Sequence, residues 1–103
     1  MKIRKGDTVK IITGDDKGKT GKVLKTLLDA NRIIVEGVNL IKRHSRPSQK
    51  NRKGGIIEKE GSISVTNVML FDQRINAPTR VGYRYLNDGT KVRINKKSGE
   101  IIE

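Results

Sequence analysis

Apolar and polar residues alternate with a period of two along much of this chain, a pattern typical of β-strands whose two faces differ in burial. Short runs rich in β-branched or apolar residues are predicted to be strands: residues 8–12, 32–36, 62–65 and 68–71. Residues 22–28 fit either a strand or a short amphipathic helix. We favour a strand, because glycines precede this segment and a turn-like sequence follows it at 29–32.

The last quarter of the chain predicts a β-hairpin. Asn87-Asp88-Gly89 is typical of hairpin turns, and Lys97-Ser98-Gly99 predicts a final turn before residues 100–102. Alternation along the strands places Val92 and Ile94 toward the core. The aromatic residues are also expected to pack in the core: Phe71, Tyr83 and Tyr85. The basic residues of the hairpin are expected on one outer face: Arg80, Arg84, Lys91 and Arg93.

Short strands joined by glycine-containing turns favour a small all-β barrel or sandwich. No helices alternate with these strands, so a parallel sheet is not expected. The chain of 103 residues has the length of a single domain. Within it we distinguish three parts: residues 1–39, 40–57 and 58–103.

Residues 14–21, GDDKGKTG, contain the Gly-Lys-Thr sequence that ends the phosphate-binding loop of many nucleotide-binding enzymes. That loop has four residues between its glycines and lies between a strand and a helix. Here only three residues separate Gly14 from Gly18, and two of them are aspartates, which would repel a phosphate. We therefore interpret the segment as a turn between antiparallel strands and disfavour the alternative of a nucleotide-binding enzyme.

Positive charge is the strongest compositional signal. Lys and Arg total 23 against 11 acidic residues, which gives a net charge of +12 and a pI near 10.3. Residues 1–53 hold 15 basic and 5 acidic residues, whereas residues 54–103 hold 8 and 6. Such a balance favours a polyanionic partner, either a nucleic acid or an acidic membrane surface. No segment combines a basic face with the apolar anchors of a membrane-surface helix, so we favour a nucleic acid.

The reactive side chains argue against catalysis. The chain has no cysteine and a single histidine, His44, which excludes thiolate metal sites and most metal or triad arrangements. Several aspartates are interpreted as turn or cap residues rather than metal ligands: Asp7, Asp15, Asp16 and Asp29. We therefore expect no enzyme activity, cofactor or metal. The chain starts without an apolar leader and contains no apolar run of membrane-spanning length, so we expect an intracellular, soluble protein.

Residues 40–57 differ from the rest of the chain in charge. No acidic residue occurs between Glu36 and Glu58, and the segment contains six Lys or Arg residues. We interpret it as a hairpin arm that orders on binding a partner. With about six residues on each side at ~3.3 Å per residue, the arm would protrude by roughly 20 Å. Such an arm fits a crevice in folded RNA.

Three segments resemble the KOW motif: residues 6–11, GDTVKI, residues 14–23, GDDKGKTGKV, and residues 34–39, IVEGVN. Several ribosomal proteins and transcription elongation factors share this motif, so the motif alone leaves both classes open. The continuation resembles the bacterial family of ribosomal protein twenty-four of the large subunit, at residues 38–44, 54–60, 67–70 and 79–83. This resemblance covers nearly the whole chain, in order.

The resemblance implies an SH3-like barrel with the KOW motif in residues 1–39, a basic arm at 40–57, and the remaining strands with the C-terminal hairpin at 58–103. It implies a structural constituent of the large ribosomal subunit, in the cytoplasm, which binds the 5′ region of the large-subunit ribosomal RNA. Roles in early subunit assembly and a position near the peptide exit tunnel are implied as well. The alternative function is a KOW-type module of a transcription elongation factor that binds polymerase or RNA.

The implied partners are the large-subunit ribosomal RNA and neighbouring large-subunit ribosomal proteins, with the nascent chain or exit-tunnel factors as further candidates. No membrane partner and no homo-oligomer are expected. Basic side chains are expected to contact RNA phosphates, which position a protein without reading sequence; the alternative for each is a solvated charge. The expected RNA-binding residues are Lys2, Arg4, Lys5, Lys17, Lys19, Lys22, Lys42, Arg43, His44, Arg46, Lys50, Asn51, Arg52, Lys53, Arg80, Arg84, Lys91 and Arg93.

Overall fold

The computed structural model describes residues 1–45 and 55–102, and within this part it describes the side chains of residues 1–41 and 58–102. The described residues form short strands and one 3-10 turn, η1 (Val65–Asn67). The strands are β1 (Thr8–Ile11), β2 (Thr20–Leu27), β3 (Arg32–Val35), β4 (Leu40–Ser45), β5 (Gly55–Glu60), β6 (Ile63–Ser64), β7 (Val68–Asp72), β8 (Ala77–Thr79), β9 (Val81–Tyr85), β10 (Lys91–Asn95) and β11 (Ile101–Ile102).

These strands form three antiparallel sheets. The main sheet has the strand order β6-β3-β2-β1-β7-β8, the C-terminal sheet has the order β11-β10-β9, and β4 pairs with β5 alone. The prediction of an all-β fold is confirmed. In the described part of the chain the main sheet stays open at β6 and β8 rather than closing into a barrel, an arrangement compatible with an SH3-like fold.

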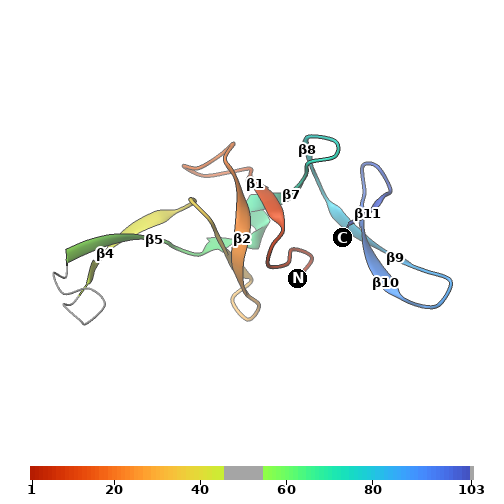
Figure 1. The fold of residues 1–103 in the computed structure, drawn as a ribbon, viewed down its shortest axis with the longest axis horizontal. Coiled ribbons are helices and arrows are strands. Elements are labelled where there is room, and N and C mark those ends of the chain that lie inside the picture. The colour runs from red at the N-terminus through yellow and green to blue at the C-terminus, as the bar shows by residue number, and fades with distance from the viewer. Residues whose placement is uncertain (46–54, 103) are drawn as a thin grey trace.

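The molecule is elongated, with principal extents of 57 × 29 × 23 Å. The β4–β5 hairpin lies at one end, the main sheet in the middle, and the C-terminal sheet at the other end (Figure 1). The hairpin prediction for the arm is confirmed in its described strands, where Leu40 pairs with Glu60 and Ser45 with Gly55. The strand favoured for residues 22–28 is confirmed up to Leu27, where β2 ends; β2 pairs with β1 through Lys22 and Thr8.

The core lies on one face of the main sheet and is built from aliphatic side chains. Val9, Val23, Ile33 and Val35 are almost completely buried. They occupy alternate or directly paired positions on β1, β2 and β3, as Val23 and Val35 do, so their side chains point to the same face. Other members come from outside these strands: Ile3, Val38, Val68, Leu70 and Val81.

The Gly-Lys-Thr segment is a turn between antiparallel strands, as predicted. Gly14 and Gly18 have φ angles of 91° and 93°, a left-handed conformation that glycine adopts without steric cost. The N–H of Lys17 donates to the Gly14 carbonyl at 3.2 Å, and the N–H of Gly18 donates to the Ile11 carbonyl at 2.8 Å. The turn leads into β2 rather than a helix, so the arrangement of a phosphate-binding loop is absent from this described segment.

Candidate nucleic-acid interface

The turn before β2 presents the first group of expected RNA-binding residues. Lys17, Lys19 and Lys22 are all exposed. The Lys19 ammonium lies 2.7 Å from the Asp16 carboxylate, and Asp16 also accepts a 2.9 Å hydrogen bond from the N–H of Asn39. Both interactions lower the pKa of Asp16, with the Lys19 bond contributing most. Asp16 therefore ties the turn to the body of the protein, which gives its lysines a defined position.

A second group of expected RNA-binding residues lies at the N-terminus. Lys2, Arg4 and Lys5 are exposed, yet the backbone around them is held in place. The N–H of Gly6 donates to the Val23 carbonyl at 2.9 Å, and the N–H of Arg4 donates to the Asp7 carboxylate at 2.8 Å. Ile3 is buried in the core. The backbone that carries the exposed cations of this segment is therefore fixed to the rest of the protein.

The arm carries the third group, of which the structure describes only the strands. Lys42, Arg43 and His44 lie on β4, where they pair with Glu58, Ile57 and Ile56 of β5. The predictions for the tip fall outside the described residues: Arg46, Lys50, Asn51, Arg52 and Lys53. The RNA contacts expected of the arm therefore stay predictions.

The prediction of one basic outer face on the C-terminal hairpin is wrong. In the observed register Arg84 pairs with Val92, whereas Lys91 pairs with Tyr85. Directly paired residues share a face, so Arg84 and Lys91 lie on opposite faces. The turn causes this register: the N–H of Leu86 donates to the Thr90 carbonyl at 2.8 Å, which leaves a three-residue loop instead of the two-residue loop that is commonest in hairpins.

Arg93 was expected on the outer face, and the structure corrects this as well. Its side chain is only 4% exposed and lies on the inner face of β10. Tyr83 of β9 is its direct cross-strand partner on this face. The guanidinium donates to the Asp7 carboxylate at 2.6 and 3.0 Å and to the Lys2 carbonyl at 3.0 Å. Asp7 is thus an ion-pair partner as well as a turn residue. Arg93 holds the C-terminal sheet against the N-terminal segment and is not available to RNA.

A second buried polar cluster fixes the C-terminal sheet to the main sheet. The Asn95 amide, which is fully buried, donates to the Asp72 carboxylate at 2.7 Å, and its carbonyl oxygen accepts from the Thr79 hydroxyl at 2.6 Å. The Asn95 bond is the main cause that lowers the pKa of Asp72; bonds from Arg74 act in the same direction, and burial opposes them. The sequence alone did not reveal this cluster, because Asn and Asp are common turn residues and are mostly exposed in folded proteins.

The prediction that the two tyrosines pack in the core is wrong. Tyr83 is 37% exposed and Tyr85 is 67% exposed. The Lys91 ammonium lies 4.1 Å from the centroid of the Tyr83 ring, and the Lys2 ammonium lies 5.9 Å from the same centroid. The C-terminal sheet and the N-terminal segment therefore present aromatic rings and cations together on one surface. We call this surface the tyrosine patch: Lys2, Tyr83, Tyr85 and Lys91.

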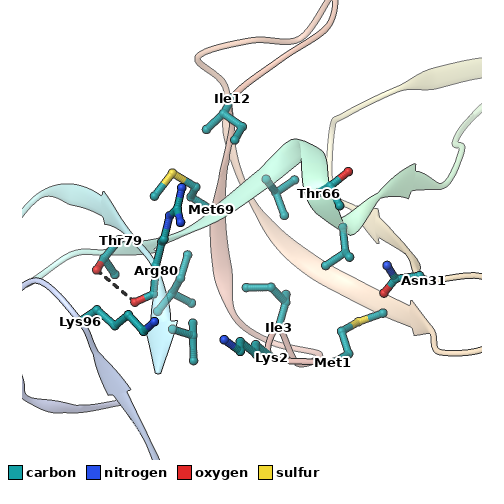
Figure 2. Close-up of a pocket in the computed structure, with 14 residues that line it drawn as sticks. Met1, Lys2, Ile3, Ile12, Asn31, Thr66, Met69, Thr79, Arg80 and Lys96 are labelled. Carbon is teal, nitrogen blue, oxygen red and sulfur yellow. Dashed lines mark hydrogen bonds between the residues drawn. The ribbon is translucent and has the colours of Figure 1, made fainter. Parts of the chain in front are cut away.

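A groove of about 490 Å³ lies between the main sheet and the start of β9. Figure 2 shows Arg80 and Lys96 on one side of it and Asn31 and Thr66 on the other, with Lys2 between them. The groove is lined by three basic side chains, those of Lys2, Arg80 and Lys96, and by no acidic side chain. Lys96 was absent from the expected RNA-binding residues, because only the tertiary structure brings it beside Lys2 and Arg80.

No cluster of three or more potential metal-ligating side chains occurs in the described part of the chain. Among these same residues, no helix has the length and apolar character needed to cross a bilayer. The exposed lysines and arginines stand on an all-β framework with an open sheet and a glycine-rich turn. These features define a class, that of small, basic, all-β proteins whose surface suits a polyanionic partner.

Comparison with known proteins identifies the family within this class. Residues 38–102 match the family described as large ribosomal subunit protein uL24, C-terminal domain, and residues 5–36 match the KOW motif. The chain is 57% identical over 103 residues to large ribosomal subunit protein uL24 of Staphylococcus aureus strains JH9, Newman and JH1, covering 100% of this chain and 97% of each relative. The chain belongs to the uL24 family of large ribosomal subunit proteins.

Proposed function

We propose that this protein binds the 5′ region of the large-subunit ribosomal RNA and assists an early step of subunit assembly. As a member of the uL24 family it is a structural rather than catalytic constituent of the large ribosomal subunit, located in the ribosome in the cytoplasm. Its partners are the ribosomal RNA and other large-subunit ribosomal proteins. We further propose a position near the peptide exit tunnel, with the nascent chain or exit-tunnel factors as additional partners.

The observation that carries the RNA-binding proposal is a set of exposed cations on anchored backbone. Lys17 lies in the turn that Asp16 ties to Asn39, Lys22 lies on the strand that follows it, and Lys2 precedes the buried Ile3. Cations held in a fixed arrangement match the phosphates of one folded RNA better than those of another. The groove adds Arg80 and Lys96 without any carboxylate. Neutralising phosphates at these positions lets RNA helices approach one another, which is the proposed contribution to assembly.

The proposal is tested by equilibrium binding of the full chain to two RNAs of equal length, at several salt concentrations. One RNA is the 5′ region of the large-subunit ribosomal RNA, and the other is an unrelated structured RNA. We expect a preference of about a hundredfold, or ~2.7 kcal/mol, that persists at physiological salt. Equal binding that disappears as salt rises would overturn the proposal, because charge alone explains it.

Single variants locate the interface. Lys17→Gln and Lys22→Gln should each weaken binding and reduce the slope of log K against log salt by about 1, as expected for loss of one phosphate contact. Lys25→Gln is the matched control, because Lys25 is exposed on the same strand as Lys22 and lies outside the expected RNA-binding set. Co-purification of the protein with RNA polymerase rather than ribosomes would favour the elongation-factor alternative instead.

A further inference from the structure

We infer that the tyrosine patch is a stacking site for an unpaired base of the bound RNA, with Tyr85 as the platform. This inference rests on the proposed function. It adds an aromatic side chain to the RNA-binding surface, which binding by charge alone does not require. Its basis is the joint presence of exposed aromatic rings and ammonium groups on one face of the C-terminal sheet. Tyrosine rings bind nucleic-acid bases face to face with little regard to sequence.

The position of Tyr85 leaves its ring accessible. Tyr85 is the last residue of β9, and β9 is an edge strand of the C-terminal sheet. Its side chain is 67% exposed, compared with 37% for Tyr83. Val81, four residues earlier on the same face of β9, is buried. The inner end of this face therefore packs against the body of the protein, while the outer end at Tyr85 is open.

The cations of the patch are placed to hold the phosphates of a stacked nucleotide. Lys91 is the direct cross-strand partner of Tyr85, so the Cβ atoms of the two residues lie about 5 Å apart. The Lys91 ammonium lies over the Tyr83 ring at 4.1 Å, which occupies Tyr83 and leaves Tyr85 as the accessible ring. A base stacked on Tyr85 would carry its phosphate toward Lys91, the cross-strand neighbour of this ring.

Charge decides between RNA and a protein segment as the occupant. The tyrosine patch consists of two phenol rings and two ammonium groups, so an aromatic group with attached negative charge matches it best. A nucleotide combines both features, since every base has a flat aromatic face and a neighbouring phosphate. An apolar protein segment would bury the ammonium groups of Lys2 and Lys91 without a counter-charge, which is unfavourable.

Tyrosine fluorescence gives a direct test, because the chain has two tyrosines and no tryptophan. In a Tyr83→Phe background the emission reports on Tyr85 alone. We expect titration with the 5′-region RNA to quench this emission in step with binding. Tyr85→Ala in the wild-type background should weaken binding by about 5- to 150-fold without changing the salt slope. Tyr85→Phe should retain affinity, and Lys91→Gln should lower the salt slope by about 1.

Leu28→Ala is the matched control, because Leu28 is also 67% exposed and lies in the turn after β2. Preferential RNA binding with unchanged Tyr85 emission, or with unchanged affinity after Tyr85→Ala, would overturn the stacking site while the proposed function stands. Quenching by other large-subunit proteins but not by RNA would assign the patch to a protein partner and overturn it too. Absence of preferential RNA binding by the wild type would overturn both inferences.

Discussion

Nη1 of Arg93 lies 2.6 Å from Oδ2 of Asp7, although 86 residues separate the two in the chain. A second guanidinium nitrogen lies 3.0 Å from Oδ1 of the same carboxylate, so the pair is bidentate. The two side chains are 4% and 8% exposed. Because water cannot solvate a charge at this buried site, each side chain needs the other as its counter-ion. This pair joins the C-terminal sheet to the N-terminal turn that precedes β1.

Removing one partner of this pair is expected to destabilise the protein strongly. Asp7→Asn leaves the Arg93 charge buried without its counter-ion, so we expect a loss of about 3–5 kcal/mol in the free energy of unfolding. Arg93→Lys should also destabilise, because a lysine lacks the planar fork that binds both carboxylate oxygens. Urea denaturation followed by circular dichroism measures both effects.

The double variant Asp7→Leu/Arg93→Met separates the cost of an unpaired charge from the value of the pair. It removes both charges and fills their place with apolar side chains of similar volume, so it should be more stable than Asp7→Asn. A double variant that is less stable than the single variant would show that Arg93 stabilises this junction even without its counter-ion, as through its 3.0 Å hydrogen bond to the Lys2 carbonyl.

Asp72 is expected to make the protein less stable in acid. Its pKa is lowered from the ordinary value of 3.8, first by the Asn95 hydrogen bond. A carboxylate with a depressed pKa in the folded state stabilises that state above its unfolded pKa, and the stabilisation is lost as the pH falls through the folded pKa. We therefore expect the free energy of unfolding to fall below about pH 4. The same titration on Asp72→Asn should show a smaller acid-dependent loss; an equal loss would assign it to other carboxylates.

Asn95→Asp should reverse this pH trend. It would place a carboxylate where the Asn95 amide now donates to Asp72 at 2.7 Å, and two adjacent buried carboxylates raise the pKa of one of them. A raised folded pKa destabilises the protein at neutral pH, and lowering the pH relieves the effect. Thermal unfolding at pH 7 and pH 5 should show a higher Tm for this variant at pH 5. Asn95→Leu is the control: it should be destabilised at both values without that recovery.

Gly21 is required because another strand passes close to it. A Cβ atom built at Gly21 would lie 2.7 Å from the Glu36 carbonyl oxygen and 2.8 Å from Cγ1 of Val35. The carbonyl belongs to the backbone and cannot rotate away, so Gly21→Ala should cost about 1–3 kcal/mol of stability, as overpacking does. Chemical denaturation measures the loss. Thr20→Ala, at an exposed neighbouring position, should change stability far less; similar losses in the two variants would contradict the steric explanation.

The sequence predicted the features that depend on local pattern. Short β-branched or apolar runs identified β1, β3 and β7, and the glycines before β2 and the turn after it favoured a strand over a helix there. The turn at Gly14 to Gly18 was recognised because left-handed backbone favours glycine. The excess of Lys and Arg, and the KOW-like segments, pointed to the family that the comparisons show. Each of these signals is carried by residues close together in the chain.

Predictions that required a register or a long-range partner failed. Arg93 was placed on the outer face because alternation put its neighbours Val92 and Ile94 toward the core. In the structure Arg93 is the buried residue, and nothing nearby in the chain indicates that Asp7 is its partner. The faces of Arg84 and Lys91 depended on the loop closed by Leu86 and Thr90, since a shift of one residue moves every side chain to the other face.

Local sequence patterns thus specify an all-β protein with a glycine turn, a basic arm and a net charge suited to a polyanionic partner. Long-range packing establishes which cations are exposed and where Arg93 and Asp7 meet. It also brings Tyr83 and Tyr85 beside Lys91, at the open end of the sheet face whose other end is buried. This division arises because propensity and charge are properties of single residues and short segments. Burial and pairing are properties of residues brought together by folding.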